Sequence, residues 1–299
     1  MSFVRRNFAV VGAARRWRPR WALAAVALAV AWPAPAAAAD GRAMLVVCAP
    51  GYPGSTQEAQ PTMDAFAAAV TAATGWPSGE LAAAYFETEA GGVERLQRGD
   101  ATLALVPLTF FLKHADALKL VPRLQAVQIG GEAAERWSLV AGKGKVTGPA
   151  SLAGWEVVSL AGYVPAFVRG VALADWGALP SDVKIVFSGA VLSGLRRAAA
   201  GENVALLLDR AQAAALPTLP FADRLEVVTR SVPLPVSVLC VVGNRLPEAR
   251  ARALTTALLD LGGVPAGAEA LAGMRITRFV PADQAAIARA QAAFNRAVP

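Results

Sequence analysis

The sequence predicts an α/β protein made of two doubly wound units with a ligand cleft between them. Apolar residues make up 55% of the 299 residues and charged residues 17%, so the chain can fill about two cores. Short apolar runs alternate with segments of helical spacing, in one series before a polar, glycine-containing break at residues 143–149 and in a second series after it. Because strands that alternate with helices pair in parallel, each series indicates its own sheet. Ligands of such sheets bind beyond the carboxyl ends of the strands, and clefts between domains are common ligand sites.

The net charge of +7 is concentrated at the N-terminus and does not point to a nucleic-acid partner. Six arginines precede residue 40 and no acidic residue does, which leaves 23 basic residues against 22 acidic ones in the rest of the chain. A nearly neutral chain has no electrostatic footprint for a polyanion. One histidine and two cysteines exclude a zinc finger, a multi-histidine metal centre and a disulfide-rich scaffold. We therefore expect no cofactor, no metal and no nucleic acid.

Residues 1–39 have the order of parts that is typical of a secretory signal peptide. The arginines lead into an uncharged apolar stretch, and Ala37-Ala38-Ala39 matches a small-residue cleavage site. We expect cleavage before Asp40 and an exported, soluble mature protein, in the periplasm if the chain resembles a periplasmic family. The alternative is an uncleaved anchor, which two prolines disfavour because a spanning helix needs about 20 strongly apolar residues. Arg5-Arg6-Asn7-Phe8 resembles a twin-arginine motif, which leaves two export routes open.

The first series begins at an apolar run that ends in Ala49-Pro50-Gly51. Gly75 follows the first segment of helical spacing as a stop signal. We expect this series to supply strands at residues 44–48, 81–86 and 102–106, and helices at 61–74, 93–98 and 109–115.

The second series follows the break and ends near a Pro-Leu-Pro boundary at residues 233–235. It is predicted to supply strands at 155–159, 183–187, 204–208 and 225–229, and helices at 164–176 and 192–200. A β-branched strand at 237–242 and helices at 247–260 and 281–298 come after the boundary and would return to the first unit. We therefore place lobe 1 at 40–145 and 233–299, lobe 2 at 146–232, and the crossovers near 143–150 and 230–236.

An ordered set of short motifs runs through both units. It consists of Tyr52-Pro53-Gly54-Ser55, Tyr85-Phe86-Glu87-Thr88-Glu89, Leu105-Val106-Pro107-Leu108-Thr109-Phe110 and Ser159-Leu160-Ala161-Gly162-Tyr163. Together these motifs resemble the periplasmic solute-binding proteins of the phosphate/phosphonate type, which have the type 2 periplasmic-binding fold, over roughly residues 44–260. The resemblance implies a monomer whose lobe 1 is built from both ends of the chain. It also implies a small phosphate- or phosphonate-like anion as ligand, captured by lobe closure, and an ABC-type membrane permease as partner.

The resemblance places the ligand against loops that follow strands, and on this chain those loops carry hydroxyls and a glycine. Free N–H groups after Ser159 would favour an anion, and Gly162 would permit close approach of the backbone. Tyr52 and Tyr163 would cover an organic part of the ligand. Ordinary helix caps explain the serines and threonines about as well. The candidate ligand-binding residues are Tyr52, Ser55, Thr56, Thr88, Thr109, Ser159, Gly162, Tyr163 and Ser188.

The remaining reactive residues give little support to catalysis. A lone His114 on a short helix is more often structural, and the sequence has neither a Gly-x-Ser-x-Gly motif nor a P-loop. Cys48 and Cys240 lie in apolar strands and are expected as buried thiols, with a disulfide as the alternative in an exported protein. The leading function is the substrate-binding protein of an ABC-type importer. The alternatives are a ligand-sensing partner of a membrane receptor and, last, an enzyme on the same fold.

Overall fold

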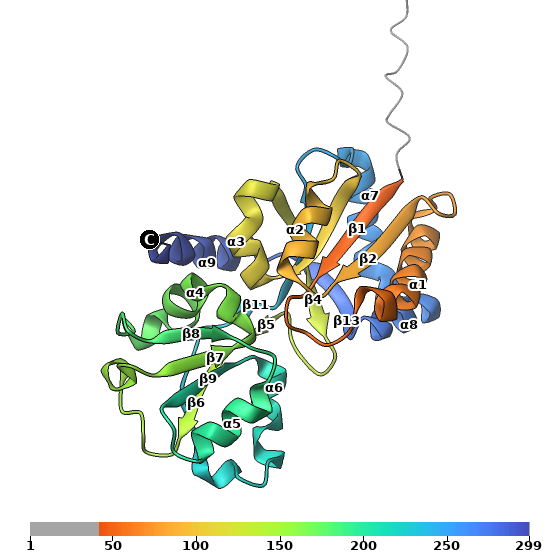
Figure 1. Cartoon of the computed structure of the whole chain (residues 1–299). Coiled ribbons are helices and arrows are strands. Elements are labelled where there is room, and N and C mark those ends of the chain that lie inside the picture. The colour runs from red at the N-terminus through yellow and green to blue at the C-terminus, as the bar shows by residue number, and fades with distance from the viewer. Residues whose placement is uncertain (1–41, 299) are drawn as a thin grey trace, which may run out of the picture. The chain divides into compact units, whose positions relative to one another are not determined.

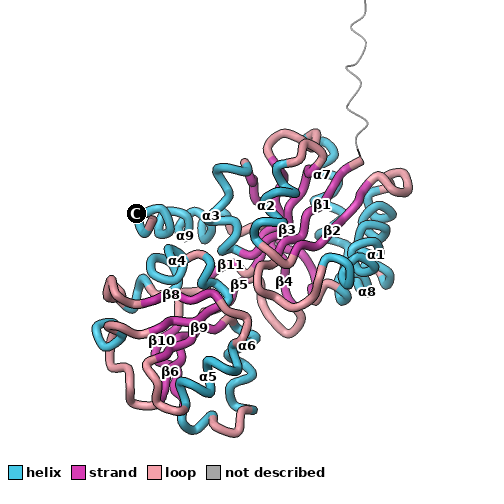
Figure 2. The backbone as a smooth tube through the Cα atoms, viewed as in Figure 1, coloured by secondary structure: helices cyan, strands magenta, loops and turns pink. Residues whose placement is uncertain are grey.

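The computed structural model describes residues 42–298, and the signal peptide expected at 1–39 lies outside them. The described strands form two large sheets and one small one, with helices packed on both large sheets (Figure 1 and Figure 2). The two-lobed α/β class expected from the sequence is confirmed. Among residues 42–298, no helix is both long enough and apolar enough to cross a membrane.

Lobe 1 is built on a six-stranded sheet with the order β13-β4-β12-β3-β1-β2. Its strands are β1 (Ala43–Cys48), β2 (Leu81–Phe86), β3 (Ala101–Pro107), β4 (Leu120–Gln128), β12 (Ser237–Val242) and β13 (Ile276–Pro281). β1 pairs in parallel with β2 and β3, whereas β12 and β13 pair antiparallel with their neighbours. The chain therefore leaves this sheet after β4 and returns to it with β12.

Helices cover both faces of the lobe 1 sheet. Those of one face are α1 (Thr56–Thr74), α7 (Glu248–Asp260) and α8 (Pro265–Gly273), and those of the other are α2 (Glu89–Gln97) and α3 (Leu108–Leu118). β3 lies inside the sheet with helices on both faces, so its side chains are buried on both sides. This burial explains why its sequence is an almost continuous apolar run. α1 begins at a capping box formed by Ser55 and Glu58 and ends at Gly75 in the left-handed conformation. This capping fixes where the loop between β1 and α1 enters the helix.

Lobe 2 is built on a five-stranded sheet with the order β10-β6-β9-β7-β8. Its strands are β6 (Ser138–Gly142), β7 (Glu156–Ser159), β8 (Lys184–Phe187), β9 (Val204–Leu208) and β10 (Leu225–Arg230). Its helices are α4 (Pro165–Phe167), α5 (Val191–Ala199) and α6 (Arg210–Ala215). Short turns of helix in this lobe occur at Pro149–Leu152, Leu160–Tyr163, Val168–Ala172, Ala174–Trp176, Leu216–Thr218 and Ala222–Arg224. One further turn, Leu261–Gly263, follows α7 in lobe 1.

The two lobes are connected by a pair of short strands and by the last helix. β5 (Ala134–Glu135) pairs antiparallel with β11 (Leu234–Pro235), so both crossing segments run side by side. α9 (Gln284–Ala297) follows β13 of lobe 1, and its Ala297 lies against Gly170 of lobe 2. These connections hold the ends of the two sheets next to each other.

The structure differs from the sequence-based expectation in several places, of which three affect how the lobes are built. The chain enters the lobe 2 sheet at β6, ahead of the crossover expected near 143–150, because the apolar run 138–142 pairs with β9 and β10. The helix expected at 164–176 is broken into α4, a π-helical turn and a 3-10 turn. The helix expected at 281–298 begins at Gln284, because Pro281 is still the last residue of the edge strand β13. Beyond these three, β4, α6 and α8 were not expected, and α1 begins five residues earlier than predicted.

Cys48 and Cys240 are free, buried thiols. They lie on β1 and β12, which β3 separates, so the disulfide considered from the sequence does not form. Burial raises the pKa of the Cys48 thiol to about 12, and the neighbouring glutamates contribute in the same direction. The thiol is therefore protonated at neutral pH and behaves as a small apolar side chain.

Candidate ligand-binding site

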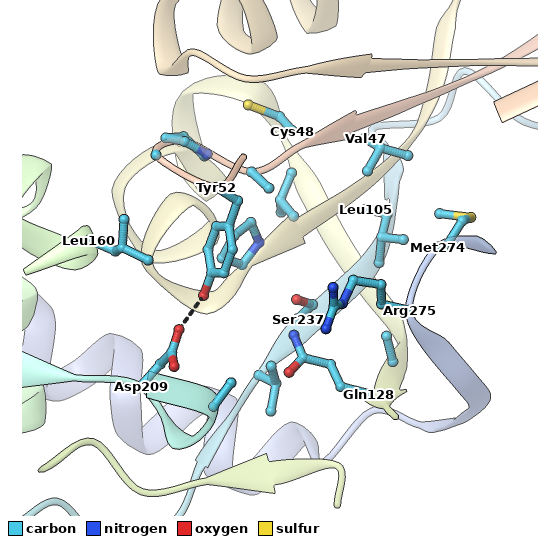
Figure 3. A pocket seen from close by; sticks show the side chains of 18 of the residues that line it. Val47, Cys48, Tyr52, Leu105, Gln128, Leu160, Asp209, Ser237, Met274 and Arg275 are labelled. Carbon is cyan, nitrogen blue, oxygen red and sulfur yellow. Dashed lines mark hydrogen bonds between the residues drawn. The ribbon is translucent and has the colours of Figure 1, made fainter. Parts of the chain in front are cut away.

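A cavity of about 690 Å³ lies where loops of the two lobes meet. Lobe 1 contributes the loop after β1, the start of α1 and the ends of β3 and β4, and lobe 2 contributes residues that follow β7 and β9. Figure 3 shows that Tyr52 of lobe 1 and Asp209 of lobe 2 point toward each other at this cavity. Because these segments follow the carboxyl ends of parallel strands, the cavity lies where open α/β sheets bind ligands.

Tyr52 joins the lobes through a hydrogen bond to a buried carboxylate. Its hydroxyl donates to Asp209 Oδ2 at 3.0 Å, and Asp209 is 4% exposed. Asp209 is also the N-cap of α6, where its Oδ1 accepts the Gln212 N–H at 2.8 Å. Burial and the charge of Asp209 raise the pKa of Tyr52 well above its usual value. The phenol therefore keeps its proton and acts as the donor.

Thr109 and Tyr163 form a second hydrogen bond across the cavity. Their hydroxyl oxygens lie 2.8 Å apart, with Thr109 at the start of α3 and Tyr163 at the end of the turn after β7. Burial raises the pKa of Tyr163 as well. Lys113 Nζ donates to the Tyr163 carbonyl at 3.3 Å, which adds a further contact between the lobes. Both lobes thus supply neutral hydroxyls to the same space.

The only histidine contacts the Glu89–Lys113 ion pair beside these hydrogen bonds. His114 Nε2 lies 2.6 Å from Glu89 Oε1, and Lys113 Nζ lies 2.7 Å from the same oxygen. The His114 ring also packs on Phe110 with 4.7 Å between ring centroids. These contacts fix the start of α2 against α3 and give His114 a structural role.

Glu135 places a second buried carboxyl group at the cavity, on β5 between the lobes. It is 6% exposed, and its Oε2 accepts the backbone N–H of Arg210 at 3.1 Å. Burial raises the pKa of Glu135 to about 7, and the charge of Asp209 adds to this shift. Arg210 Nη1 donates to the Gly130 carbonyl at 2.8 Å, which ties the start of α6 to the crossing segment. The cavity is therefore acidic where the crossing strands reach it.

The loop after β1 is packed closely against lobe 2. Gly51 has φ +82°, and a Cβ there would lie 2.8 Å from Phe187 Cε2 and 2.9 Å from Leu160 Cδ2. Only glycine satisfies both the backbone conformation and the space at this position. This contact brings Tyr52, the next residue, within reach of Asp209.

Three of the nine sequence-predicted ligand residues line the cavity, namely Tyr52, Thr109 and Tyr163. The other six make local contacts whose partners the structure identifies. Ser55 and Thr88 cap α1 and α2, Thr56 donates to Glu87, Ser159 donates to the Leu207 carbonyl, Gly162 packs on β8, and Ser188 accepts the Ala190 N–H. A ligand contact for any of the nine residues remains a prediction.

The charged residues of the cavity are not among the nine ligand residues predicted from the sequence. Asp209 directly follows the expected strand at 204–208, so the rule that selected Thr109 would also have selected it. Glu135 and Arg275 carried no such signal, because β5 and β13 were not recognised as strands. Their positions depend on the crossing segment and on the return of the chain to lobe 1.

A family model identifies the family of this chain. The model described as ABC transporter, phosphonate, periplasmic substrate-binding protein matches residues 53–287. The chain belongs to this family. The family resemblance inferred from the sequence motifs is thereby confirmed, and the family's proteins are periplasmic substrate-binding proteins. Among curated proteins, no match to the sequence was found.

Solved structures show the same fold at low sequence identity. XAC2383 from Xanthomonas citri, solved bound to ATP, has a TM-score of 0.67 at 15% identity, covering 86% of this chain and 98% of that one. A binding protein component of an ABC phosphonate transporter from Pseudomonas aeruginosa has a TM-score of 0.58 at 15% identity, covering 86% and 88%. PhnD1 from Prochlorococcus marinus, solved in complex with methylphosphonate, has a TM-score of 0.59 at 14% identity, covering 86% and 98%. These similarities support the type 2 periplasmic-binding fold.

Proposed function

We propose that this chain is the periplasmic receptor of an ABC-type importer and captures a small organic anion by closure of its lobes. The observation that carries the proposal is the cavity to which both lobes contribute, with the hydrogen bonds Tyr52–Asp209 and Thr109–Tyr163 across it. A ligand that contacts both lobes favours the conformation in which they meet. The closed receptor then presents its solute to the membrane permease.

The polar groups of the cavity suit capture of a solute. One of the Thr109 and Tyr163 hydroxyls donates to the other, so one proton of this pair remains for a ligand, whereas Tyr52 already donates to Asp209 and offers its oxygen as an acceptor. Glu135 and Asp209 accept hydrogen bonds from the protein itself. The family and the solved proteins that share the fold are substrate-binding proteins. We therefore propose binding without turnover, with a ligand of the phosphate or phosphonate class.

Native mass spectrometry of the protein from its own periplasm tests this proposal. We expect a retained small anion that is released unchanged, and calorimetric binding of methylphosphonate or of the retained solute. The variant Thr109→Val removes a cavity hydroxyl and should weaken that binding about three- to tenfold, since a neutral hydrogen bond contributes roughly 0.5–1.5 kcal/mol. Thr255→Val, on the opposite side of the sheet in α7, is the matched control. Chemical conversion of the solute, or the absence of any bound solute, would contradict the proposal.

We further propose export with removal of residues 1–39, motivated by the arginine-rich start and the Ala37-Ala38-Ala39 site. N-terminal sequencing of the periplasmic protein should then begin at or within a few residues of Asp40. Recovery of the intact chain with the membrane fraction would support an anchor instead.

A further inference from the structure

The cavity is larger than a small phosphonate requires. Its volume of about 690 Å³ falls within the roughly 300–1,000 Å³ that is typical of sites for drug-sized ligands. Methylphosphonate has only a few heavy atoms and would fill a minor part of this space. The residues that line the remaining space therefore indicate what kind of solute would fill it.

Part of the cavity extends into lobe 1, between its sheet and the helices α1 and α8. We call this part the lobe 1 chamber and define it by Val47, Met63, Leu105, Ala126, Met274 and Arg275. Val47 is the register partner of Leu105, so their side chains lie side by side on one face of the sheet. Met63 of α1 and Met274 at the end of α8 face the same space. The walls of the chamber are therefore apolar, and methionine side chains adapt to varied shapes.

Arg275 provides the positive charge at the chamber. It adopts a left-handed conformation with φ +60° in the turn between α8 and β13, where its carbonyl accepts the Ile129 N–H. Figure 3 shows its guanidinium pointing toward Gln128 and Ser237 at the cavity. Among residues 42–298, no ion pair or side-chain hydrogen bond involves this guanidinium. The group has free donors in a geometry that matches a carboxylate or phosphonate.

The other charged residues of the cavity are already engaged. Glu58 accepts from Ser55, Glu135 accepts from Arg210, and Asp209 accepts from Tyr52 and Gln212. Arg210 is committed to the Gly130 carbonyl, although its Nε has no partner. An anion near Glu135 and Asp209 would be repelled by these carboxyl groups. Of the charged side chains that line the cavity, Arg275 is thus the one with neither a hydrogen bond nor an ion pair to residues 42–298, and it lies apart from the hydrogen bonds of Glu135 and Asp209.

We propose that the solute is an organic anion with an extended apolar body, held with its acid group at Arg275 and its body in the lobe 1 chamber. This inference rests on the proposed function and specifies the class of solute. The polar remainder of the solute faces the hydroxyls of Tyr52, Thr109 and Tyr163. A bare phosphate or methylphosphonate would pair with Arg275 but would make little contact with the apolar walls of the chamber.

A series of n-alkylphosphonates tests the chamber by isothermal titration calorimetry. Burial of each added methylene contributes roughly 0.8 kcal/mol, so we expect affinity to rise by up to about fourfold for each methylene from methyl- to hexylphosphonate. Ala59→Leu narrows the chamber from α1 and should abolish this gain, because Ala59 lines the cavity. Ala68→Leu changes an exposed position of the same helix and should preserve the gain.

Arg275→Gln tests the charge. We expect it to weaken hexylphosphonate binding at least about tenfold, whereas Arg278→Gln, at an exposed position of β13 outside the cavity, should leave binding unchanged. Thermal melting of each variant controls for folding. Equal affinity for methyl- and hexylphosphonate, or full binding by Arg275→Gln, would overturn the inference while leaving solute capture intact.

If no alkylphosphonate binds, the proposal is tested on the solute that the protein retains when it is purified from its own periplasm. A retained acid with an apolar body supports the chamber, and a retained solute without one overturns it. The absence of any retained solute would contradict the proposed function itself. The failure of the chamber and the failure of solute capture are therefore distinguishable.

Discussion

At the scale of single residues, a helix cap and a ligand contact compete for the same hydroxyl. Ser159 is 1% exposed, and its Oγ donates to the Leu207 carbonyl at 2.7 Å and accepts the Ala161 N–H at 3.1 Å. A serine hydroxyl has one proton, so a ligand would have to replace the bond to Leu207 to receive it. Tyr163, four residues later, instead turns its hydroxyl toward Thr109 and the cavity. The pattern serine-then-glycine after a strand therefore predicts a cap at least as well as a binding site.

Glu135 predicts a pH dependence of stability at the residue scale. Its pKa is about 7 in the folded protein, against an ordinary value of 4.5, because burial disfavours the charged form. Over this range the unfolded chain releases the proton that the folded protein retains, so the free energy of unfolding falls as pH rises from about 4.5 to about 7. The loss is of order 1.4 kcal/mol for each pH unit of that range.

Urea denaturation at pH 5 and pH 8 measures this effect. Glu135→Gln cannot ionise and should lose less stability between the two values than the wild type loses. Glu132→Gln, at an exposed position in the same segment, should keep the wild-type dependence. A Glu135→Gln variant with an unchanged pH dependence would show that Glu135 does not titrate in this way.

At the scale of elements, the sequence predicted the short apolar strands best. β1, β2, β7, β9 and β12 coincide closely with expected strands, because each is a short apolar run bounded by turn residues. β4 mixes exposed and buried positions, and the edge strand β13 has two exposed residues in its middle, so neither shows a clear pattern. The helix expected at 164–176 is broken at a π-helical turn, Val168–Ala172, whose Gly170 packs against Ala297 of α9. Propensity alone does not reveal that neighbour.

The candidate site was predictable only where it follows a recognised strand. Tyr52, Thr109 and Tyr163 come after β1, β3 and β7, and the rule for open α/β sheets selects such positions. Glu135 and Arg275 reach the cavity from β5 and from the turn before β13, which long-range pairing places there. The local pattern around these two residues contains no information about that pairing.

Gly162 yields a prediction at the element scale, because the turn after β7 lies directly on β8. A Cβ at Gly162 would lie 2.6 Å from the Phe187 backbone nitrogen, and a backbone atom cannot move aside as a flexible side chain can. We expect Gly162→Ala to lower the free energy of unfolding by roughly 1–3 kcal/mol, as overpacking commonly does. Gly148→Ala, where a Cβ meets nothing within 4 Å, is the control. Chemical denaturation that gives equal stabilities for both variants would refute this close contact.

At the scale of the whole molecule, the lobes meet through polar contacts at the cavity and through apolar packing that continues from one lobe to the other. Tyr52–Asp209 and Thr109–Tyr163 cross the cavity, while the paired strands β5 and β11 carry the chain between the lobes. A hydrogen bond to a charged group contributes about 1.5–3 kcal/mol and a neutral one about 0.5–1.5 kcal/mol. A change of about 1.4 kcal/mol alters the ratio of open to closed molecules tenfold. Bonds of this strength would therefore allow a receptor to close on its solute and to open again for release.

The double variant Tyr52→Phe/Tyr163→Phe tests whether these two bonds hold the lobes together. Removing both hydroxyls should raise the ratio of open to closed molecules at least about tenfold, because the two contributions act on the same equilibrium. Small-angle X-ray scattering of the solute-free protein should then give a larger radius of gyration than the wild type. Tyr85→Phe is the matched control, because the Tyr85 hydroxyl approaches only the Ala49 and Tyr52 carbonyls of lobe 1, each at 3.5 Å. Unchanged scattering of the double variant would place the closing contacts elsewhere, with the packing of Gly51 on Leu160 and Phe187 as the next contact to disrupt.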